Sequence, residues 1–316
     1  MMVLVAGEID REESIRTHVL VSQGLGTVLG AIGMLALAIS WWFRRRGTVR
    51  LAQAGWVLVG FHFFNMAWVF AGHDDIVLTV MSSMTLPLSC YAAWLEERSS
   101  GRGKEALHWA RGTVAFAGGP YLLIAYVPYL SVLAIWLVAA QSAAFLGFAT
   151  GTDITLGTTW VNDPSGRVSW EAWEGNRWFA TEFTGDYPFQ TELLLADGTL
   201  IGVNFVLACT AIQSMVLFVG AIAVLDLPWK RRVRALLLVI PLIHLLNLFR
   251  NAGLIWMHMT YTQWDLWGMS VFEFGHSYVA RFFSLFAMFL MALIMFELLP
   301  MMHRHILSLT SSNLHE

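Results

Sequence analysis

The chain of 316 residues has few charged side chains, two cysteines and no excess of basic residues. Charged residues make up 13% of the sequence and hydrophobic residues 57%, which excludes an ordinary soluble domain. The net charge of −3 gives no support for nucleic-acid binding. Cys90 and Cys209 are too few for a disulfide framework, and their spacing indicates no metal site. The absence of His-Glu-x-x-His, P-loop and dinucleotide-binding motifs means that no cofactor is expected.

Long apolar stretches dominate the sequence instead. A membrane-spanning helix needs about 20 apolar residues, and seven stretches qualify clearly: 19–43, 51–72, 76–95, 113–129, 203–228, 235–257 and 278–300. An eighth apolar stretch, 130–149, directly follows Pro128 and Tyr129. Gly26 and Gly30 have the spacing of residues that allow helices to pack closely. We predict an all-α polytopic membrane protein, a single membrane domain over 1–316 with seven, or alternatively eight, transmembrane helices.

The longest polar segment, 151–200, is rich in glycine, tryptophan and threonine. Turn residues Asp197 and Gly198 separate two segments that mix polar and apolar residues, 191–195 and 199–201, and this pattern predicts a β-hairpin. The segment therefore forms a small strand-containing insertion before the helix that carries Cys209.

Basic residues set the expected orientation, because cytoplasmic loops carry an excess of lysine and arginine. Three clusters and the tail contain 13 of the 19 basic residues: Arg44, Arg45, Arg46 and Arg50; Arg98, Arg102, Lys104 and Arg111; Lys230, Arg231, Arg232 and Arg234; and Arg304. The segment 151–200 has two arginines against eight acidic residues. We expect the clusters and the C-terminus in the cytoplasm, and 151–200 and the N-terminus outside.

This orientation bears on the segment 130–149. If it spans the membrane, 151–200 falls on the same side as the basic clusters. If 130–149 is instead a half-inserted or surface-lying helix on the outer leaflet, the number of crossings places 151–200 outside. The polar residues Gln141 and Ser142 make such a position tolerable for this helix. Seven spans with an eighth, non-spanning helix is therefore the preferred topology.

An arginine inside an apolar span is a functional candidate, since it costs about 2.5–3.5 kcal/mol to insert. Arg250 is such a residue, and it lies about seven residues from the outer end of its predicted span. Cys209 lies at a similar depth, about 10 Å, in the preceding span. His276 and Arg281 enter the last span from outside. Three consecutive predicted helices over 203–300 thus bring Cys, Arg and His to one layer near the outer face.

Polar residues lie near both Arg250 and Cys209 in the sequence. His244, Asn247 and Asn251 share one helical face beside Arg250, and such a stripe should face the bundle interior. Gln213 and Ser214 lie one turn beyond Cys209 and Thr210. A cysteine thiolate is a nucleophile, His276 could transfer a proton, and Arg250 could stabilise an oxyanion. These residue types suit acyl transfer by a cysteine enzyme.

Other interpretations remain. A cysteine in an apolar helix is more often a packing residue, the interpretation retained for Cys90. Arg250 could be structural, paired with carbonyls, Asp265 or Glu273. The alternative function is a secondary transporter or binding protein for an anionic solute, with Arg250 recognising the anion. The lack of an evident internal repeat counts against it.

The order of motifs resembles the exosortase/archaeosortase family, in its archaeal branch. Ala208-Cys209-Thr210 with Gln213-Ser214 is followed by Asn247-x-x-Arg250-Asn251 and then by His276 before the last apolar helix. The resemblance covers roughly 200–300 well and the earlier spans only in character.

The resemblance implies a multi-pass membrane cysteine transpeptidase with its active site near the extracytoplasmic face. Its partners would be exported surface proteins with a tripartite C-terminal signal: a short motif such as Pro-Gly-Phe, a transmembrane helix and a basic cluster. A membrane lipid would be the acceptor that anchors the processed protein. Cys209 is implied as nucleophile, with Arg250 and His276 as its partners. Parts of the archaeal branch favour an arginine in the third position, so the resemblance leaves Arg281 as the alternative to His276. Arg281 is kept as a site neighbour, because an α-helix would turn two residues five positions apart to different faces.

Overall fold

The computed structural model describes residues 25–43, 46–72, 76–164, 166–179, 187–266 and 268–310. The chain divides into two compact units. The first lies within 1–115 and 303–316, and the second lies within 116–302. Two helices, α4 (Gly101–Tyr126) and α10 (Pro300–Thr310), contribute residues to both units.

The first unit is helical in its described residues. It contains the helix Leu25–Trp42, the short η1 (Arg46–Thr48), α2 (Val49–Gly72), α3 (Ile76–Arg98), the first part of α4 and the last part of α10. A Cβ atom added at Gly30 would lie 2.6 Å from Cγ of His62 in α2. Close helix packing at Gly30 is therefore confirmed.

A buried ion pair crosslinks this unit. Nε of Arg111 in α4 lies 3.1 Å from Oε1 of Glu96 in α3, which also accepts a hydrogen bond from Trp56 in α2. Arg111 is 5% exposed, although the sequence places it in a basic cluster. It is thus a structural cation, because removing one partner of a buried pair leaves the other charge unpaired.

The second unit combines helices with a sheet. After the end of α4 come α5 (Pro128–Thr150), β1 (Ile154–Asp163), β2 (Gly166–Ser169), β3 (Phe189–Leu195) and β4 (Leu200–Phe205). The four strands form an antiparallel sheet in the order β2-β1-β3-β4. The predicted hairpin around Asp197-Gly198 is confirmed as β3–β4, and the positive φ of 82° at Gly198 explains the glycine there.

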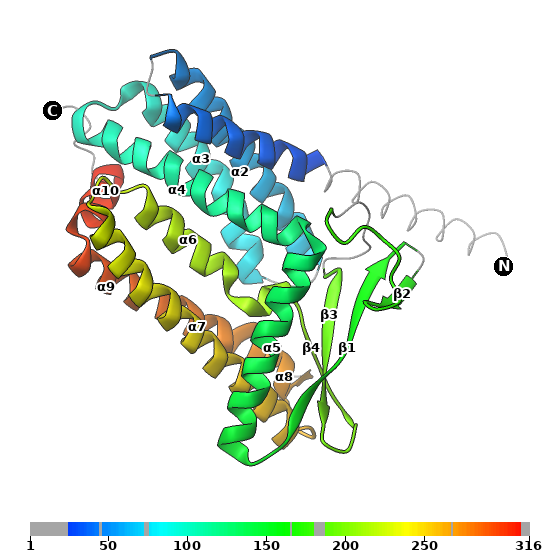
Figure 1. Cartoon of the computed structure of the whole chain (residues 1–316). Coiled ribbons are helices and arrows are strands. Elements are labelled where there is room, and N and C mark those ends of the chain that lie inside the picture. The colour runs from blue at the N-terminus through cyan, green and yellow to red at the C-terminus, as the bar shows by residue number, and fades with distance from the viewer. Residues whose placement is uncertain are drawn as a thin grey trace, which may run out of the picture. The chain divides into compact units, whose positions relative to one another are not determined.

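Helix α5 covers one face of this sheet (Figure 1). Its buried residues Ile135 and Ala139 pack with Val161 of β1 and Leu193 of β3 in one hydrophobic core. Trp136 Nε1 donates a 2.6 Å hydrogen bond to Thr159 Oγ1, which lies 2.8 Å from Thr191 Oγ1. The core and these bonds hold the sheet, whose strand β4 leads to Cys209, against a long helix.

The chain then passes through the residues of interest. The short 3₁₀-helix η2 (Leu207–Thr210) follows β4, and α6 (Ile212–Ala223) and α7 (Trp229–Thr260) come next. The two-residue strands β5 (Asp265–Leu266) and β6 (Met269–Ser270) pair before α8 (Val271–Phe274). A π-helical turn, η3 (Gly275–Val279), joins α8 to α9 (Ala280–Leu298).

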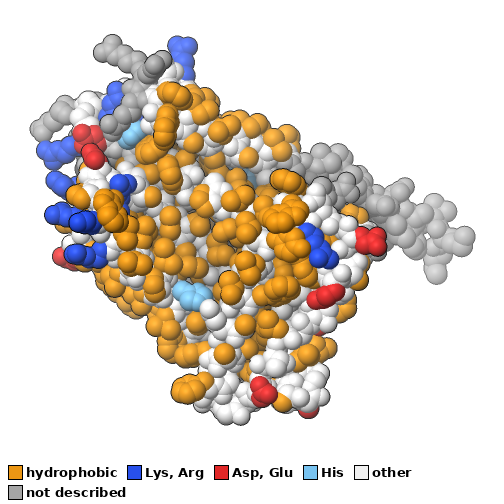
Figure 2. All heavy atoms as spheres, viewed as in Figure 1, with side chains coloured by type: hydrophobic (Ala, Val, Ile, Leu, Met, Phe, Trp, Pro, Cys, Tyr) orange, Lys and Arg blue, Asp and Glu red, His pale blue; other side chains and the backbone are white. Residues whose placement is uncertain are grey.

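Six helices in the described residues are long and apolar enough to cross a membrane: Leu25–Trp42, α2, α3, α5, α7 and the continuous stretch Val271–Leu298. Hydrophobic side chains cover much of the face shown in Figure 2. A multi-pass membrane protein is thus supported, whereas the count of seven or eight spans is not confirmed. Residues 19–24 of the first predicted span lie outside the described residues.

Three predicted stretches differ from the structure. The stretch 113–129 is divided between the end of α4 and the start of α5, and α4 is not among the six candidate spans of the described residues. The stretch 130–149, predicted to be half-inserted or surface-lying with a full span as the alternative, belongs to the apolar helix α5, which is a candidate span about 35 Å long at 1.5 Å per residue. The stretch 203–228 is not one helix: β4 and η2 occupy its first part, and α6 has 12 residues. Alternating burial in β4, with Ile201, Val203 and Phe205 inside, explains why the strand forms there.

Candidate functional site

Cys209 lies in the turn that connects the sheet to α6. The Thr210 hydroxyl donates a 2.6 Å hydrogen bond to the carbonyl oxygen of Leu207, which closes this turn. Ala211 has a left-handed conformation, with φ of 56°, and the helix α6 begins directly after it. Left-handed backbone at a residue with a Cβ costs of order 1–3 kcal/mol and persists only where the surroundings impose it.

Two asparagines of α7 impose the position of Cys209. Asn247 Nδ2 and Asn251 Nδ2 donate hydrogen bonds of 2.8 and 3.0 Å to the carbonyl oxygen of Cys209. Both asparagines are buried, at 6% and 4% exposure, and they lie four residues apart on one face of α7. A buried carbonyl with two donors is fully satisfied, so the turn is fixed to α7.

The Cys209 side chain is half-buried and packs against the core between α5 and the sheet. Cys209 lies outside the six candidate spans. Burial raises the pKa of its thiol, while a main-chain contact with Val206 and the charge of Arg250 act in the opposite direction. The net direction is upward, so the neutral thiol is the resting form at pH 7.

Arg250 is the cation whose charge acts on this thiol. It follows Phe249 on α7, and its Nη1 donates a 3.3 Å hydrogen bond to Asn251 Oδ1. Within the described residues, its buried Nε has no hydrogen-bond partner. Arg250 therefore has one N–H donor that no described residue uses.

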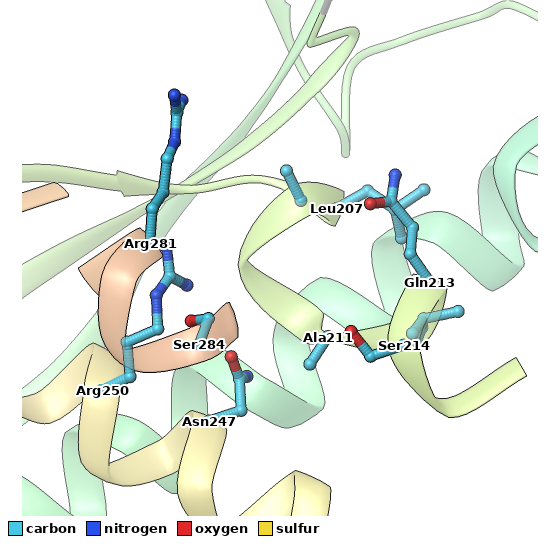
Figure 3. Close-up of a pocket in the computed structure, with 10 residues that line it drawn as sticks. Leu207, Ala211, Gln213, Ser214, Asn247, Arg250, Arg281 and Ser284 are labelled. Carbon is cyan, nitrogen blue, oxygen red and sulfur yellow. The ribbon is translucent and has the colours of Figure 1, made fainter. Parts of the chain in front are cut away.

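A cavity of about 180 Å³ adjoins Arg250. Three elements besides α7 form its walls, and the lining residues are Leu207, Ala208, Ala211, Ile212, Gln213, Ser214, Asn247, Arg250, Arg281 and Ser284. Figure 3 shows Arg250 and Arg281 on one side of this cavity, with Gln213 across from them. The residues on either side of the Cys209–Thr210 pair, Ala208 and Ala211, line the cavity, whereas Cys209 is not among its described lining residues.

The polar residues predicted near Cys209 and Arg250 contact different helices. Gln213 Nε2 donates a 2.8 Å hydrogen bond to the hydroxyl of Tyr121 in α4, and Ser214 Oγ lies 3.4 Å from Met288 Sδ in α9. His244 bonds to Gln141 of α5. Sequence reasoning missed Tyr121 and Ser284, because no spacing pattern links them to Cys209.

His276 and Arg281 are separated by the π turn. His276 lies in η3 and stacks on Phe272, with ring centroids 5.8 Å apart. Arg281, at the start of α9, lines the cavity, and its charge interacts with that of Arg250. Among the described residues that line the cavity, His276 does not occur. The extra residue of a π turn changes the angular relation that an α-helix would give these two residues.

The fold and the cavity together define a class of protein: a multi-pass membrane protein with a cysteine at a sheet-to-helix turn, next to an arginine-lined cavity. The chain is similar to archaeosortase A of Haloferax volcanii, with 26% identity over 204 residues. That match covers 64% of this chain and 60% of the relative, so it spans less than two thirds of the relative's length. It supports a relationship to the archaeosortase/exosortase family.

No family model matches the chain. No solved structure matches it either.

Proposed function

We propose that this chain is a membrane cysteine transpeptidase that processes the C-terminal sorting signal of exported proteins. The observation that carries the proposal is the position of Cys209, held by two asparagines of α7 beside Arg250, in a chain similar to archaeosortase A. The substrate would carry a tripartite tail of the Pro-Gly-Phe type. Processing would be coupled to anchoring of the protein on a membrane lipid.

The reaction starts at the Cys209 thiol. After the thiol loses its proton, the sulfur attacks the carbonyl carbon of the scissile peptide bond, and a tetrahedral oxyanion forms. Collapse of this intermediate breaks the C–N bond, leaves a thioester on Cys209 and releases an amine that takes up a proton. A second nucleophile then attacks the thioester and regenerates the thiol.

Arg250 serves two of these steps. Its charge favours the thiolate over the thiol, which offsets part of the effect of burial on Cys209. Its unpartnered Nε gives a preorganised donor for the developing oxyanion, in a site partly shielded from water. A guanidinium remains charged throughout, so Arg250 stabilises charge and does not move protons.

The third group is either Arg281 or His276. Arg281 lines the cavity and interacts with Arg250, whereas His276 stacks on Phe272. We favour Arg281, which would act by charge alone. His276, implied by the family resemblance, would instead transfer the proton between the thiol and the leaving amine.

The proposed orientation places the sheet and Cys209 near the extracytoplasmic face, with the N-terminus outside and the C-terminus in the cytoplasm. The basic residues at the start of α7, exposed Lys230, Arg231 and Arg234, support this orientation, since such clusters stay in the cytoplasm. Exported chains would then reach Cys209 from the side on which their tails emerge.

The test is processing of a co-expressed substrate whose C-terminus carries a Pro-Gly-Phe motif, an apolar helix and an arginine cluster. Cys209→Ala should abolish cleavage, whereas Cys90→Ala, the matched substitution at an exposed cysteine, should leave it intact. Normal cleavage by Cys209→Ala would refute the enzyme and leave the anion transporter as the remaining candidate.

A further inference from the structure

His258 connects the last turn of α7 to the strand that leads to Cys209. Its Nε2 atom lies 3.0 Å from the carbonyl oxygen of Ile201 in β4. A carbonyl oxygen can only accept a hydrogen bond, so Nε2 carries a proton and is the donor. The ring of His258 also packs against Phe272 of α8, with the ring centroids 5.4 Å apart and the ring planes at 73°. The side chain of His258 therefore contacts both β4 and α8.

The backbone of β4 is irregular at the point where His258 binds. The pairing of β3 with β4 changes register there, and residues 201–203 lie opposite a single residue of β3. Gly202, in the middle of this bulge, has a positive φ of 84°, which glycine adopts without strain. A Cβ atom added at Gly202 would touch Nε2 of His258 at 3.4 Å. A bulge takes main-chain groups out of the β-ladder, and His258 supplies a donor at this point.

His258 lies on the same face of α7 as the two asparagines that bond to Cys209. Asn251 and His258 follow Asn247 by four and eleven positions, and at 3.6 residues per turn the three side chains lie within about 40° of one another. All three donate hydrogen bonds to main-chain carbonyl oxygens of the preceding segment: the asparagines to Cys209 and His258 to Ile201. Helix α7 therefore holds the segment 201–209 at both ends.

We propose that His258 is a positioning residue for the reaction at Cys209. The inference rests on the proposed function, because the position of the thiol affects a rate only if the thiol reacts. The two asparagines hold the thiol end of the segment 201–209, and His258 holds the sheet end. Without the contact at the sheet end, the segment gains freedom to move relative to Arg250. Such freedom slows the reaction, because attack needs the reacting atoms aligned at about 3–3.5 Å.

The first test measures amide hydrogen exchange of the full chain in detergent, which needs no substrate. His258→Ala should speed exchange in the segment 201–209 about fivefold, as expected for the loss of one hydrogen bond. His258→Gln should restore protection, because its side-chain amide nitrogen can replace Nε2 as the donor. His244→Ala is the matched control, since His244 lies on the same helix and bonds to Gln141 of α5. It should leave exchange in 201–209 unchanged.

The second test measures processing kinetics of the same variants. His258→Ala should lower kcat about fivefold with KM unchanged, and His258→Gln should recover most of the loss. His258→Asn, a milder truncation whose amide is too short to reach Ile201, replaces His258→Ala if that variant does not fold. Unchanged exchange in 201–209 overturns the inference, and so does faster exchange with an unchanged kcat, which would make His258 merely structural. Failure of the proposed function is seen separately, as normal processing by Cys209→Ala.

Discussion

Asn251 Nδ2 donates a 3.0 Å hydrogen bond to the carbonyl oxygen of Cys209, which lies 42 positions earlier in the chain. With Asn247, it connects the turn that carries the thiol to the helix that carries Arg250. The mutual position of thiol and guanidinium therefore depends on hydrogen bonds from two side chains of α7 to the main chain of Cys209. A purely structural asparagine would affect stability, whereas this one should affect the reaction as well.

Asn251→Ala should slow processing more than it destabilises the protein. Loss of one such hydrogen bond costs about 1 kcal/mol, or about fivefold in rate if the whole cost falls on the transition state. Asn162→Ala is the control, because Asn162 of β1 also donates a side-chain hydrogen bond to a main-chain oxygen, that of Tyr187 just before β3. Rates of processing and thermal midpoints of both variants check this prediction. Equal loss of activity in the two variants would contradict it.

The reactivity of Cys209 should rise with pH across the neutral range. Burial favours the protonated thiol and raises its pKa, so the thiolate fraction increases about tenfold per pH unit below that value. Arg250→Gln removes the cation that stabilises the thiolate, and it should move the titration to still higher pH. Alkylation rates in a Cys90→Ala background measure both effects, with Arg234→Gln as the charge control. If Arg250→Gln leaves the pH midpoint of Cys209 alkylation unchanged, Arg250 does not stabilise the Cys209 thiolate.

Arg281 and His276 can be told apart by their pH profiles. Arg281→Gln should reduce processing about 100-fold or more at every pH, as expected for the loss of a preorganised charge. His276→Gln should leave the shape of the profile unchanged, because His276 packs on Phe272. If His276→Gln abolishes processing and removes one limb of the profile, proton transfer by His276 is the correct assignment.

The orientation of the sheet can be tested by labelling single cysteines in a background that lacks Cys90 and Cys209. Thr199→Cys, in the exposed β3–β4 turn, should react with a membrane-impermeant maleimide in intact cells. Arg231→Cys, at the exposed start of α7, should react only after permeabilisation. The reverse pattern would invert the topology and place the site on the cytoplasmic side.

Local signals in the sequence predicted the parts of the fold that depend on local chemistry. Asp197 and Gly198 marked the β3–β4 turn because that turn needs a positive φ at its glycine. Gly30 marked close helix packing because no side chain fits against His62. The spacing of Asn247 and Asn251 put both on one buried face of α7.

The remaining features depend on contacts that the sequence does not encode locally. The apolar run around Val203 and Phe205 has the same hydropathy in a strand as in a membrane helix, so the span predicted over 203–228 began inside the strand. Pairing with β3 decides in favour of the strand. The bond between Gln213 and Tyr121 joins positions 92 residues apart, and no helical periodicity reports it. The π turn that separates His276 from Arg281 likewise escapes a calculation based on α-helical rotation.

The central claim is that Cys209 forms a covalent acyl intermediate. Its most direct measurement is the intact mass of the solubilised chain after brief reaction with a tailed peptide substrate and acid quench. The account predicts a mass increase equal to the acyl fragment, located on Cys209, present in Cys90→Ala and absent in Cys209→Ala. Cleavage of the peptide by Cys209→Ala, or an acyl fragment attached to another residue, would contradict it.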